Sequence, residues 1–217
     1  MAPNGARPST VPLEAGIGPA NPPCPACGEP LFGWATTPDA TPVRRCEACG
    51  LGVVGDPGDG AEALAALEQL RIEGGDDPRY RIANRASLQA SLGGSGWALF
   101  EADSRYLFTA EAVRRLASGR DQQVARVRWR PGSSIVSMWG TLLNSFTWGR
   151  NVALGALGRA VATPADRRWQ RGMDATISVV ATPIVLLAAL LMEAGAAVAG
   201  RGGVLELTLR LGDRLGP

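Results

Sequence analysis

All four cysteines of this chain lie in one stretch as two C-x2-C pairs, and this feature limits the possible folds more than any other. The four residues are Cys24, Cys27, Cys46 and Cys49. Two such pairs, separated by residues 28–45, have the spacing of a tetrahedral zinc site with four sulfur ligands. A glycine follows each pair and permits a turn in which backbone N–H groups point at sulfur. The stretch predicts a zinc ribbon; two disulfides or free buried cysteines are the alternatives.

The number of cysteines also predicts the role of the metal. Four protein ligands complete a tetrahedron, whereas a catalytic zinc keeps one position for water or substrate. We therefore expect structural Zn2+ and assign no catalytic residue. Four thiolates around a divalent ion leave a formal charge of about −2. Arg44 and Arg45, just before Cys46, would offset this charge if they face the metal; the alternative is that both are solvated surface arginines.

The charge balance argues against nucleic acid as a partner. The chain has 22 basic residues against 20 acidic ones, a formal net charge of +2, and no histidine. Such a balance produces no strong field toward a polyanion, so no nucleic acid is expected. Residues 1–23 lack the apolar run of a signal peptide. We expect a disordered tail over 1–21 and a cytoplasmic protein, in which thiols stay reduced.

Hydrophobic periodicity predicts several elements after the ribbon. Residues 51–54 suggest a short strand, 61–73 a helix and 74–81 a loop. A second helix should begin at the N-cap Thr109 and stop at Gly119. Alternation predicts two strands of one sheet, over 123–131 and 202–213. Their expected inward residues are Ala125, Val127, Trp129, Leu205, Leu207, Leu209 and Leu211, with Glu206, Thr208 and Arg210 on the wet face.

Residues 175–192 contain no charge and approach the minimum length of a bilayer span. Arg167, Arg168 and Arg171 precede this segment, and the positive-inside rule would place that side in the cytoplasm. Pro183 interrupts the segment and a strand follows it closely, so we expect a buried or interface-lying helix rather than a span. Contact with a membrane surface through 175–192 remains an alternative. Three tryptophans near its approaches suit either a core or an interface: Trp139, Trp148 and Trp169.

Three stretches, in order, resemble the zinc-ribbon class I S-adenosylmethionine-dependent methyltransferases. The first is "CPACG…RRCEACGLGVVGDP", which is similar to the family's opening. The second is "NRASLQASLGGSGWALFEADSRYLFTAEAVRRL", which looks like the passage after the family's fifth strand. The third joins "WRPGSSIVSMWGTLLNSF…NVALGAL" to "GRGGVLELTLR" and resembles the family's apolar cap and last strand. The resemblance covers about two thirds of the chain and implies kinship with these enzymes.

The family's cofactor-binding half has no counterpart here. The family holds adenosylmethionine with a strand, a glycine-rich turn and a helix N-terminus. Residues 58–83 leave room for about one helix and a loop, whereas a parallel strand pair with its crossover takes about thirty residues. With no histidine or lysine in the sequence, the usual neutral-pH bases are missing. Glu101, Asp103 and Tyr106 would be substitutes for such a base, against the simpler view that they form a solvated loop.

These observations predict an α+β fold: an N-terminal zinc ribbon followed by a partial Rossmann-like methyltransferase remnant, a small antiparallel sheet with apolar helices. The expected divisions are a tail (1–21), the ribbon (22–57), a helix and linker (58–83) and a methyltransferase C-terminal-like region (84–217) with an apolar cap (132–200). We expect a non-catalytic binding or accessory subunit that does not bind adenosylmethionine alone. The alternatives are a methyltransferase component completed by a partner chain and a membrane-associated zinc-ribbon adaptor. Uncovered sheet edges and apolar surface predict a protein partner or a homo-oligomer.

Overall fold

A computed structural model describes residues 21–37, 40–74, 77–100, 104–158, 162, 165 and 167–211. Over these residues the fold is α+β, with two four-stranded sheets and six α-helices. All pairings between these strands are antiparallel. The expected tail over 1–21 lies almost entirely outside the described residues.

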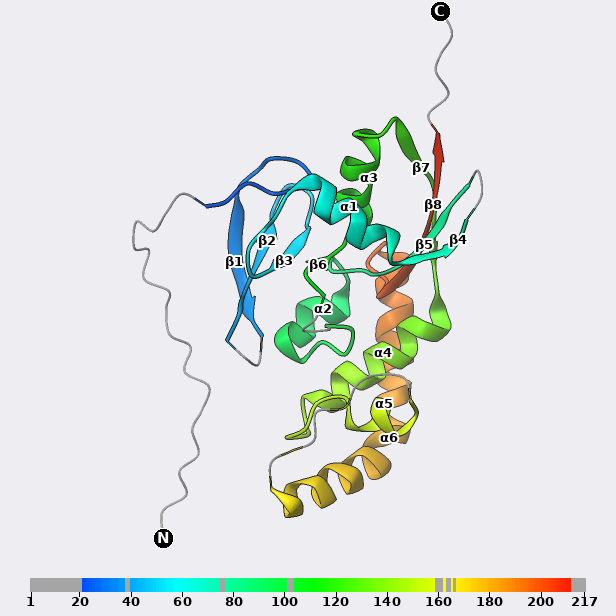
Figure 1. Ribbon diagram of the computed structural model, residues 1–217. Coiled ribbons are helices and arrows are strands. Elements are labelled where there is room, and N and C mark those ends of the chain that lie inside the picture. Colours follow the sequence, from blue (N-terminus) through cyan, green and yellow to red (C-terminus); the bar gives the residue numbers. More distant parts are fainter. Residues whose placement is uncertain are drawn as a thin grey trace, which may run out of the picture.

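The first sheet carries the ribbon (Figure 1). Its order is β1 (Leu31–Thr36), β2 (Pro42–Cys46), β3 (Gly52–Val54) and β6 (Tyr106–Leu107). The short strand expected over 51–54 is therefore present. The last strand comes from far along the chain, and its Tyr106 pairs with Val53. The ribbon is thus joined to the later part of the chain by backbone hydrogen bonds.

The second sheet has the order β4 (Arg71–Glu73), β5 (Arg79–Ala83), β8 (Val204–Leu211) and β7 (Gln122–Trp129). The expected pairing of the two alternating strands is confirmed, because Val127 lies opposite Leu207 and Trp129 opposite Leu205. In the centre of the sheet, β8 buries Leu205, Leu207 and Leu209. A central strand is covered on both sides, which explains its continuous burial from Val204 to Leu207.

The secondary structure predicted for residues 61–81 was partly wrong. A helix was expected over 61–73 and a loop over 74–81, but α1 spans Gly60–Glu68 and strands β4 and β5 follow it. Asp59 caps α1 by accepting a hydrogen bond from the Glu62 N–H. The strand β5 forms because β8 offers it a sheet edge and Tyr80 and Ile82 enter the core. This long-range pairing outweighs the local helix propensity.

The prediction of which residues face inward on the two alternating strands was also partly wrong. Val127 and Ala125 are exposed, because β7 is the edge strand and its register shifts between Val124 and Arg126. Trp129 was also expected to face inward and is half-buried, whereas Leu211 is exposed at the end of β8. The expected wet residue Glu206 is buried, because Arg79 and Arg130 pair with its carboxylate from both sides.

One core joins the ribbon to the second sheet. The helices α1 and α3 (Ala110–Ser118) contribute to it, and Thr109 and Gly119 flank α3 as expected. Short helices α2 (Leu88–Gly93) and η1 (Gly94–Gly96) precede a turn whose Trp97 and Phe100 pack beside Leu107 in a second cluster. The shared core contains three of the four cysteines together with residues of the strands and helices, among them Cys24, Cys46, Cys49, Leu51, Val53, Leu67, Tyr80, Ile82, Phe108, Val113, Leu116, Leu205, Leu207 and Leu209.

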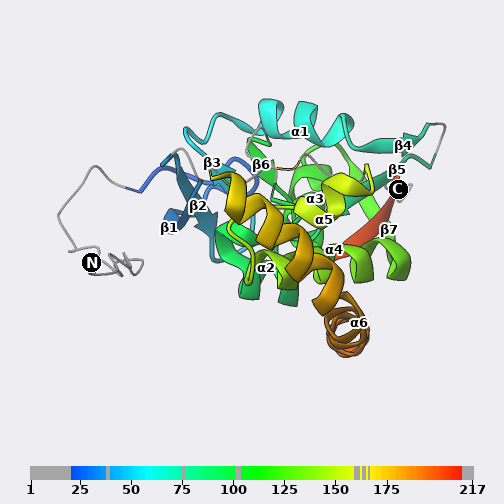
Figure 2. The same ribbon diagram turned by 90° about the horizontal axis from the view of Figure 1, so that it is seen from below.

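Three helices, here called the helical unit, lie at the lower end of the molecule in Figure 1, below the second sheet. They are α4 (Pro131–Asn144), α5 (Val152–Ala156) and α6 (Arg168–Val198). Their own core contains Met138, Trp139, Leu143, Leu154 and Ala189. Figure 2 shows one stretch of α6 lengthwise and the other end-on, so the helix is bent. Pro183 lies inside it, removes one backbone donor and sterically opposes the preceding turn, which accounts for a bend.

Pro183 therefore bends the apolar helix rather than ending it, and α6 continues through Glu193. By length and composition, α6 is the one helix among the described residues that could span a membrane, and only 17% of its most apolar window is buried. Large apolar side chains along it face outward. The structure therefore does not bury 175–192 in the core of the described chain, which was one of the two forms expected for this segment; the other was an interface-lying helix.

Candidate metal centre

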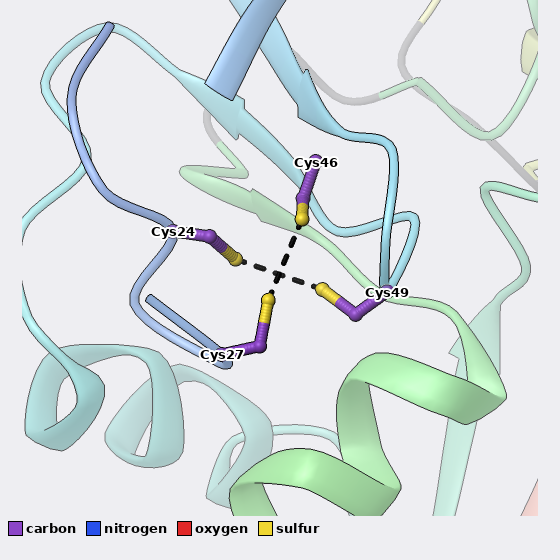
Figure 3. A group of neighbouring side chains, drawn as sticks. All are labelled: Cys24, Cys27, Cys46 and Cys49. Carbon is purple, nitrogen blue, oxygen red and sulfur yellow. Dashed lines mark hydrogen bonds between the residues drawn. The ribbon is translucent and has the colours of Figure 1, made fainter. Parts of the chain in front are cut away.

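The four predicted cysteines meet at one point between the ribbon and α3 (Figure 3). Each pair sits on a tight turn closed by backbone hydrogen bonds, from the Gly28 N–H to the Cys24 carbonyl (2.8 Å) and from the Gly50 N–H to the Cys46 carbonyl (2.9 Å). The two glycines have φ of 80° and 74°. This left-handed conformation favours glycine and confirms its predicted role in the turns.

The sulfur positions fit a tetrahedral ion. The sulfurs of Cys24 and Cys49 are 3.6 Å apart and those of Cys27 and Cys46 3.5 Å apart. All four ligand atoms lie within 4.8 Å of one another. Zinc–sulfur bonds of about 2.3 Å place the corners of a tetrahedron about 3.8 Å apart. A disulfide needs about 2.05 Å between its sulfurs, so the cysteines are free thiols and the disulfide alternative is wrong.

The metal-free thiols share their protons unequally. The hydrogen bond with Cys49 lowers the pKa of Cys24 to about 5, and the same bond raises the pKa of Cys49 far above its usual value. Burial raises the pKa of Cys27 to about 11. Like charges this close disfavour simultaneous ionisation. A divalent cation would hold all four as thiolates, and with no coordination position left open it would supply structural cross-linking.

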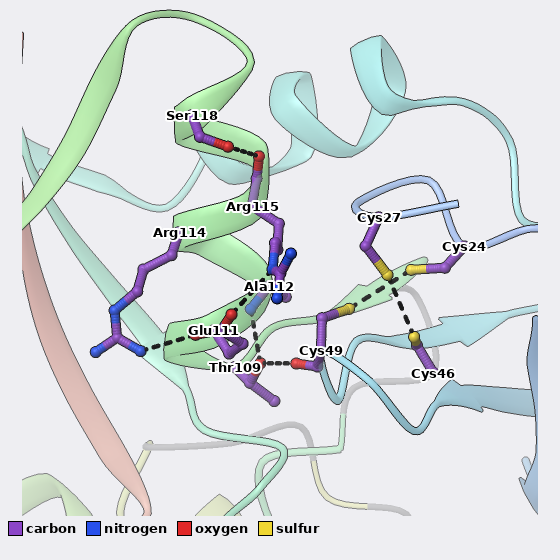
Figure 4. A network of polar contacts seen from close by, with 10 residues as sticks. All are labelled: Cys24, Cys27, Cys46, Cys49, Thr109, Glu111, Ala112, Arg114, Arg115 and Ser118. Carbon is purple, nitrogen blue, oxygen red and sulfur yellow. Dashed lines mark hydrogen bonds and ion pairs between the residues drawn. The ribbon is translucent and has the colours of Figure 1, made fainter. Parts of the chain in front are cut away.

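Helix α3 is attached directly to the second cysteine turn (Figure 4). The Thr109 hydroxyl accepts from the Ala112 N–H at 3.0 Å as the N-cap, and donates to the Cys49 carbonyl at 2.5 Å. A Cβ on Gly50 would lie 2.9 Å from the Thr109 methyl carbon. The cap of Thr109 was predicted from the sequence, but its bond to Cys49 was not, because local patterns carry no information about a contact across 60 residues.

The arginines next to the cysteines in the sequence, Arg44 and Arg45, make their contacts away from the cluster. Arg44 donates to the Gly55 carbonyl at 2.9 Å, and Arg45 pairs with Glu47 at 3.1 Å. By contrast, the pKa of Arg115 on α3 is raised, first by its hydrogen bond to Glu111 and further by the charges of Cys27 and Cys49. The predicted offset by Arg44 and Arg45 therefore finds no support in their contacts, because β2 directs both toward other partners.

A buried arginine forms a second connection between the ribbon and the rest of the chain. The Arg85 guanidinium lies 3.9 Å from the centre of the Trp34 ring, and the residue is only 6% exposed. Burial, and then the charge of Arg45, lower its pKa to about 10. Its Nε and Nη2 atoms have no hydrogen-bond partner among the described residues. The stacked ring is thus the main partner of a cation that stays charged at neutral pH.

Of the three residues considered as substitute bases, Tyr106 alone lies in the part of the chain that the structure describes. Glu101 and Asp103 lie outside the described residues. Tyr106 is buried in β6, and its hydroxyl donates to the Pro57 carbonyl at 2.8 Å. Burial raises the pKa of this hydroxyl. A tyrosine held in this way stabilises the ribbon's exit rather than presenting a base.

A cleft of about 610 Å³ opens beside Cys49, between α3, the strands β7 and β8, and the end of α6. Its described polar side chains already bond within the protein. Asn84 donates to the Gly202 carbonyl at 2.9 Å, and Arg114 pairs with Glu111 at 3.0 Å. The cleft therefore offers no preassembled acid, base or nucleophile among these lining residues, and we assign no reaction to it.

Comparison with known proteins identifies no relative. No family model, no curated protein and no solved structure matches this chain. The four-cysteine cluster is accordingly the chemical feature on which a functional assignment rests.

Proposed function

We propose that this chain is a non-catalytic, methyltransferase-like zinc-ribbon protein that acts as a binding or accessory subunit. The observation that carries the proposal is the cluster of four thiols with tetrahedral spacing, three of which are buried in a core shared by both sheets. A metal with four protein ligands stabilises a fold and leaves no position for a substrate. The role of the ribbon is therefore to hold a surface in shape for a protein partner.

The sheet arrangement supports a role without bound adenosylmethionine. Nucleotide cofactors of open α/β sheets bind at the carboxyl ends of parallel strands, and each pairing between the described strands is antiparallel. The later segments resemble a methyltransferase cap, and a chain that kept this cap without the cofactor-binding half would still have a surface for a partner. We propose that the second sheet also derives from a methyltransferase.

Calorimetry and capture from the native host test this proposal together. The zinc-loaded protein should carry about one metal equivalent and should not bind adenosylmethionine or its demethylated product at micromolar concentration. It should retain a protein partner that the Cys27→Ser/Cys46→Ser variant loses. Arg120→Gln, an exposed change away from the cluster, is the control and should retain the partner.

Two results would overturn the accessory role. Micromolar binding of adenosylmethionine by the isolated chain would show that it holds the cofactor itself. Capture of a chain that carries a complete cofactor-binding half, with methylation by the pair, would instead favour the alternative of a shared enzyme.

A second candidate is a membrane-associated zinc-ribbon adaptor. The observation that favours it is the outward apolar surface of α6, where Val180 and Ile184 are 72% and 77% exposed. Soluble monomers rarely leave so large a contiguous apolar surface in water. A membrane would cover this surface while the ribbon remains in the aqueous phase.

A further inference from the structure

We propose that the helical unit binds an anionic lipid bilayer from one side, with α6 embedded in a single leaflet and its exposed arginines at the headgroups. This inference rests on the membrane-associated form of the function proposed above. It adds the class of lipid, the residues that contact it and the topology of insertion.

Helix α6 exposes aliphatic side chains and buries its acidic ones, the reverse of what is expected of a surface helix in water. The large side chains that its middle turns expose are aliphatic, among them Val179, Val180, Ile184, Leu187 and Leu191, which are 59–77% exposed. Its two acidic residues, Asp174 and Glu193, are both completely buried. A surface helix of a water-soluble protein buries its apolar stripe and exposes its charges. The arrangement in α6 suits an apolar medium on the outside.

The two buried carboxylates of α6 are hydrogen-bonded within the protein, as an apolar medium requires. The Asp174 carboxylate accepts hydrogen bonds from the Trp148 N–H at 2.9 Å and the Gly149 N–H at 2.8 Å. Glu193 accepts from the Trp129 indole at 3.3 Å and from the Gly203 N–H. These bonds hold the non-helical connection after α4 and the exit of α6 against the helix.

The connections of the unit favour one leaflet over a span. The helix α4 begins directly after β7, and α6 leads into β8, the antiparallel neighbour of β7. The chain therefore leaves and re-enters the unit at the same sheet. If α6 crossed the bilayer, the chain between β7 and α6 would have to cross it as well. The longest helix described there is α4, whose 14 residues extend only about 21 Å, less than the hydrocarbon thickness of about 30 Å.

The exposed charge at the start of α6 selects the lipid. Both basic residues of the helix, Arg168 and Arg171, are exposed, and Arg167 precedes them. Since both acids are buried, the exposed charge of α6 is entirely positive. Beside these arginines, the rings of Trp148 and Trp169 contact edge to face at 5.5 Å, and both are more than half exposed. Arginine with tryptophan is the combination that binds anionic headgroups and the membrane interface.

Flotation with lipid vesicles tests the proposal on the zinc-loaded full chain. The protein should float with vesicles that contain phosphatidylglycerol and bind vesicles of phosphatidylcholine alone less tightly, and added salt should reduce the difference. Arg167→Gln/Arg168→Gln should lower the affinity for the anionic vesicles about tenfold. Arg120→Gln/Arg126→Gln is the matched control; it removes equal charge at exposed positions outside α6 and should change this affinity little.

The apolar face has its own variant. Ile184→Asn/Leu187→Asn/Leu191→Asn should lower binding to both kinds of vesicle by about 100-fold, because three inserted aliphatic side chains are lost. Leu211→Asn, at a residue 70% exposed on the opposite end of β8, is its control and should bind like the wild type. Unchanged zinc content and circular dichroism in each variant confirm that it folds.

Three results would overturn the inference. Equal binding to neutral and anionic vesicles would remove the role of the arginines. A soluble dimer in detergent-free buffer that ignores both vesicles, and that the triple asparagine variant converts to monomer, would assign the face to a second copy. Failure of the triple variant to reduce binding would exclude α6 as the contact. None of these results changes zinc content or adenosylmethionine binding, which test the accessory role separately.

Discussion

At the scale of single residues, Glu193 connects the helical unit to the rest of the protein. It lies in α6, is completely buried, and accepts hydrogen bonds from Gly203 at the start of the β8 segment, from the Trp129 indole, and from the Gln89 amide at 3.5 Å. The space around it is also tight, because a Cβ on Gly203 would lie 1.3 Å from the Gln89 amide nitrogen. One carboxylate thus joins α2, α6, β7 and the chain before β8.

We expect Glu193→Ala to lower the free energy of unfolding by about 3 kcal/mol, since it leaves several buried donors without an acceptor. Glu193→Gln keeps one acceptor oxygen and should cost less than half as much. Urea unfolding of the zinc-loaded protein, followed by circular dichroism, measures both. Equal stability of the alanine variant and the wild type would show that these bonds contribute nothing net.

The thiol pKa values predict how acid releases the metal. Cys27, with a pKa of about 11, and Cys49, whose pKa is raised further, both hold protons at neutral pH in the metal-free protein. Zinc must displace at least these two protons, so its apparent affinity falls as the pH falls. We expect a loss of about 100-fold per pH unit between pH 8 and 6, measured by competition with a chelating dye. A pH-independent affinity would contradict the assignment of the ligands.

At the scale of secondary-structure elements, close packing of α4 on α5 depends on a glycine. A Cβ on Gly140 would lie 2.4 Å from one Leu154 methyl and 3.2 Å from the Ala98 Cβ. Leu154 is buried and has little room to move. The glycine in α4 therefore permits the approach of α5, whereas Gly172 in α6 has open space around its Cα.

These two glycines should respond in opposite ways to the same substitution. Gly140→Ala should destabilise the protein by about 1–2 kcal/mol through overpacking, and Gly172→Ala should stabilise it by about 0.5–1 kcal/mol through helix propensity. Adding Leu154→Ala to Gly140→Ala should cost less than the sum of the single changes, because it removes the overlap. Thermal unfolding of the four variants decides this; additive effects would show that the two side chains do not meet.

At the scale of the whole molecule, the metal centre should stabilise both sheets. Three of its cysteines share one core with Tyr80 of β5, Leu207 of β8 and Val113 of α3. The strands β5 and β8 pair directly, with Tyr80 opposite Leu207. Removal of the metal should therefore loosen the second sheet as well as the ribbon.

Hydrogen exchange with and without a chelator measures this coupling. We expect the amides of Tyr80 and Leu207 to lose about tenfold or more of their protection when zinc is removed, together with those of β1 and β2. The amides of α4 should change less, because its core is a separate cluster. Loss of protection confined to the ribbon would show two independent units, and an intact metal-free fold would refute the structural role of zinc.

The elements that were predictable are those with strong local signals. The cysteine spacing predicted the metal cluster, the caps predicted α3, and alternation predicted the pairing of β7 with β8. The strands β4 and β5 were missed because β5 forms by pairing with β8, whose sequence lies more than a hundred residues away, and β4 pairs in turn with β5. The apolar character of α6 was predicted from the sequence. Its exposure was not, because exposure depends on whether another element of the fold packs against the helix.

The sequence by itself determined the ligands of the metal and the polarity of each local segment, because C-x2-C turns, helix caps and residue periodicity act within a few residues. Only the tertiary structure decided which side of each element faces inward. It buried Glu193 and Glu206 beside donors from distant strands and left the aliphatic side of α6 exposed. The reason is physical: burial is a property of the surfaces that meet in three dimensions, and pairing between distant segments can reverse a preference set by neighbours in the chain.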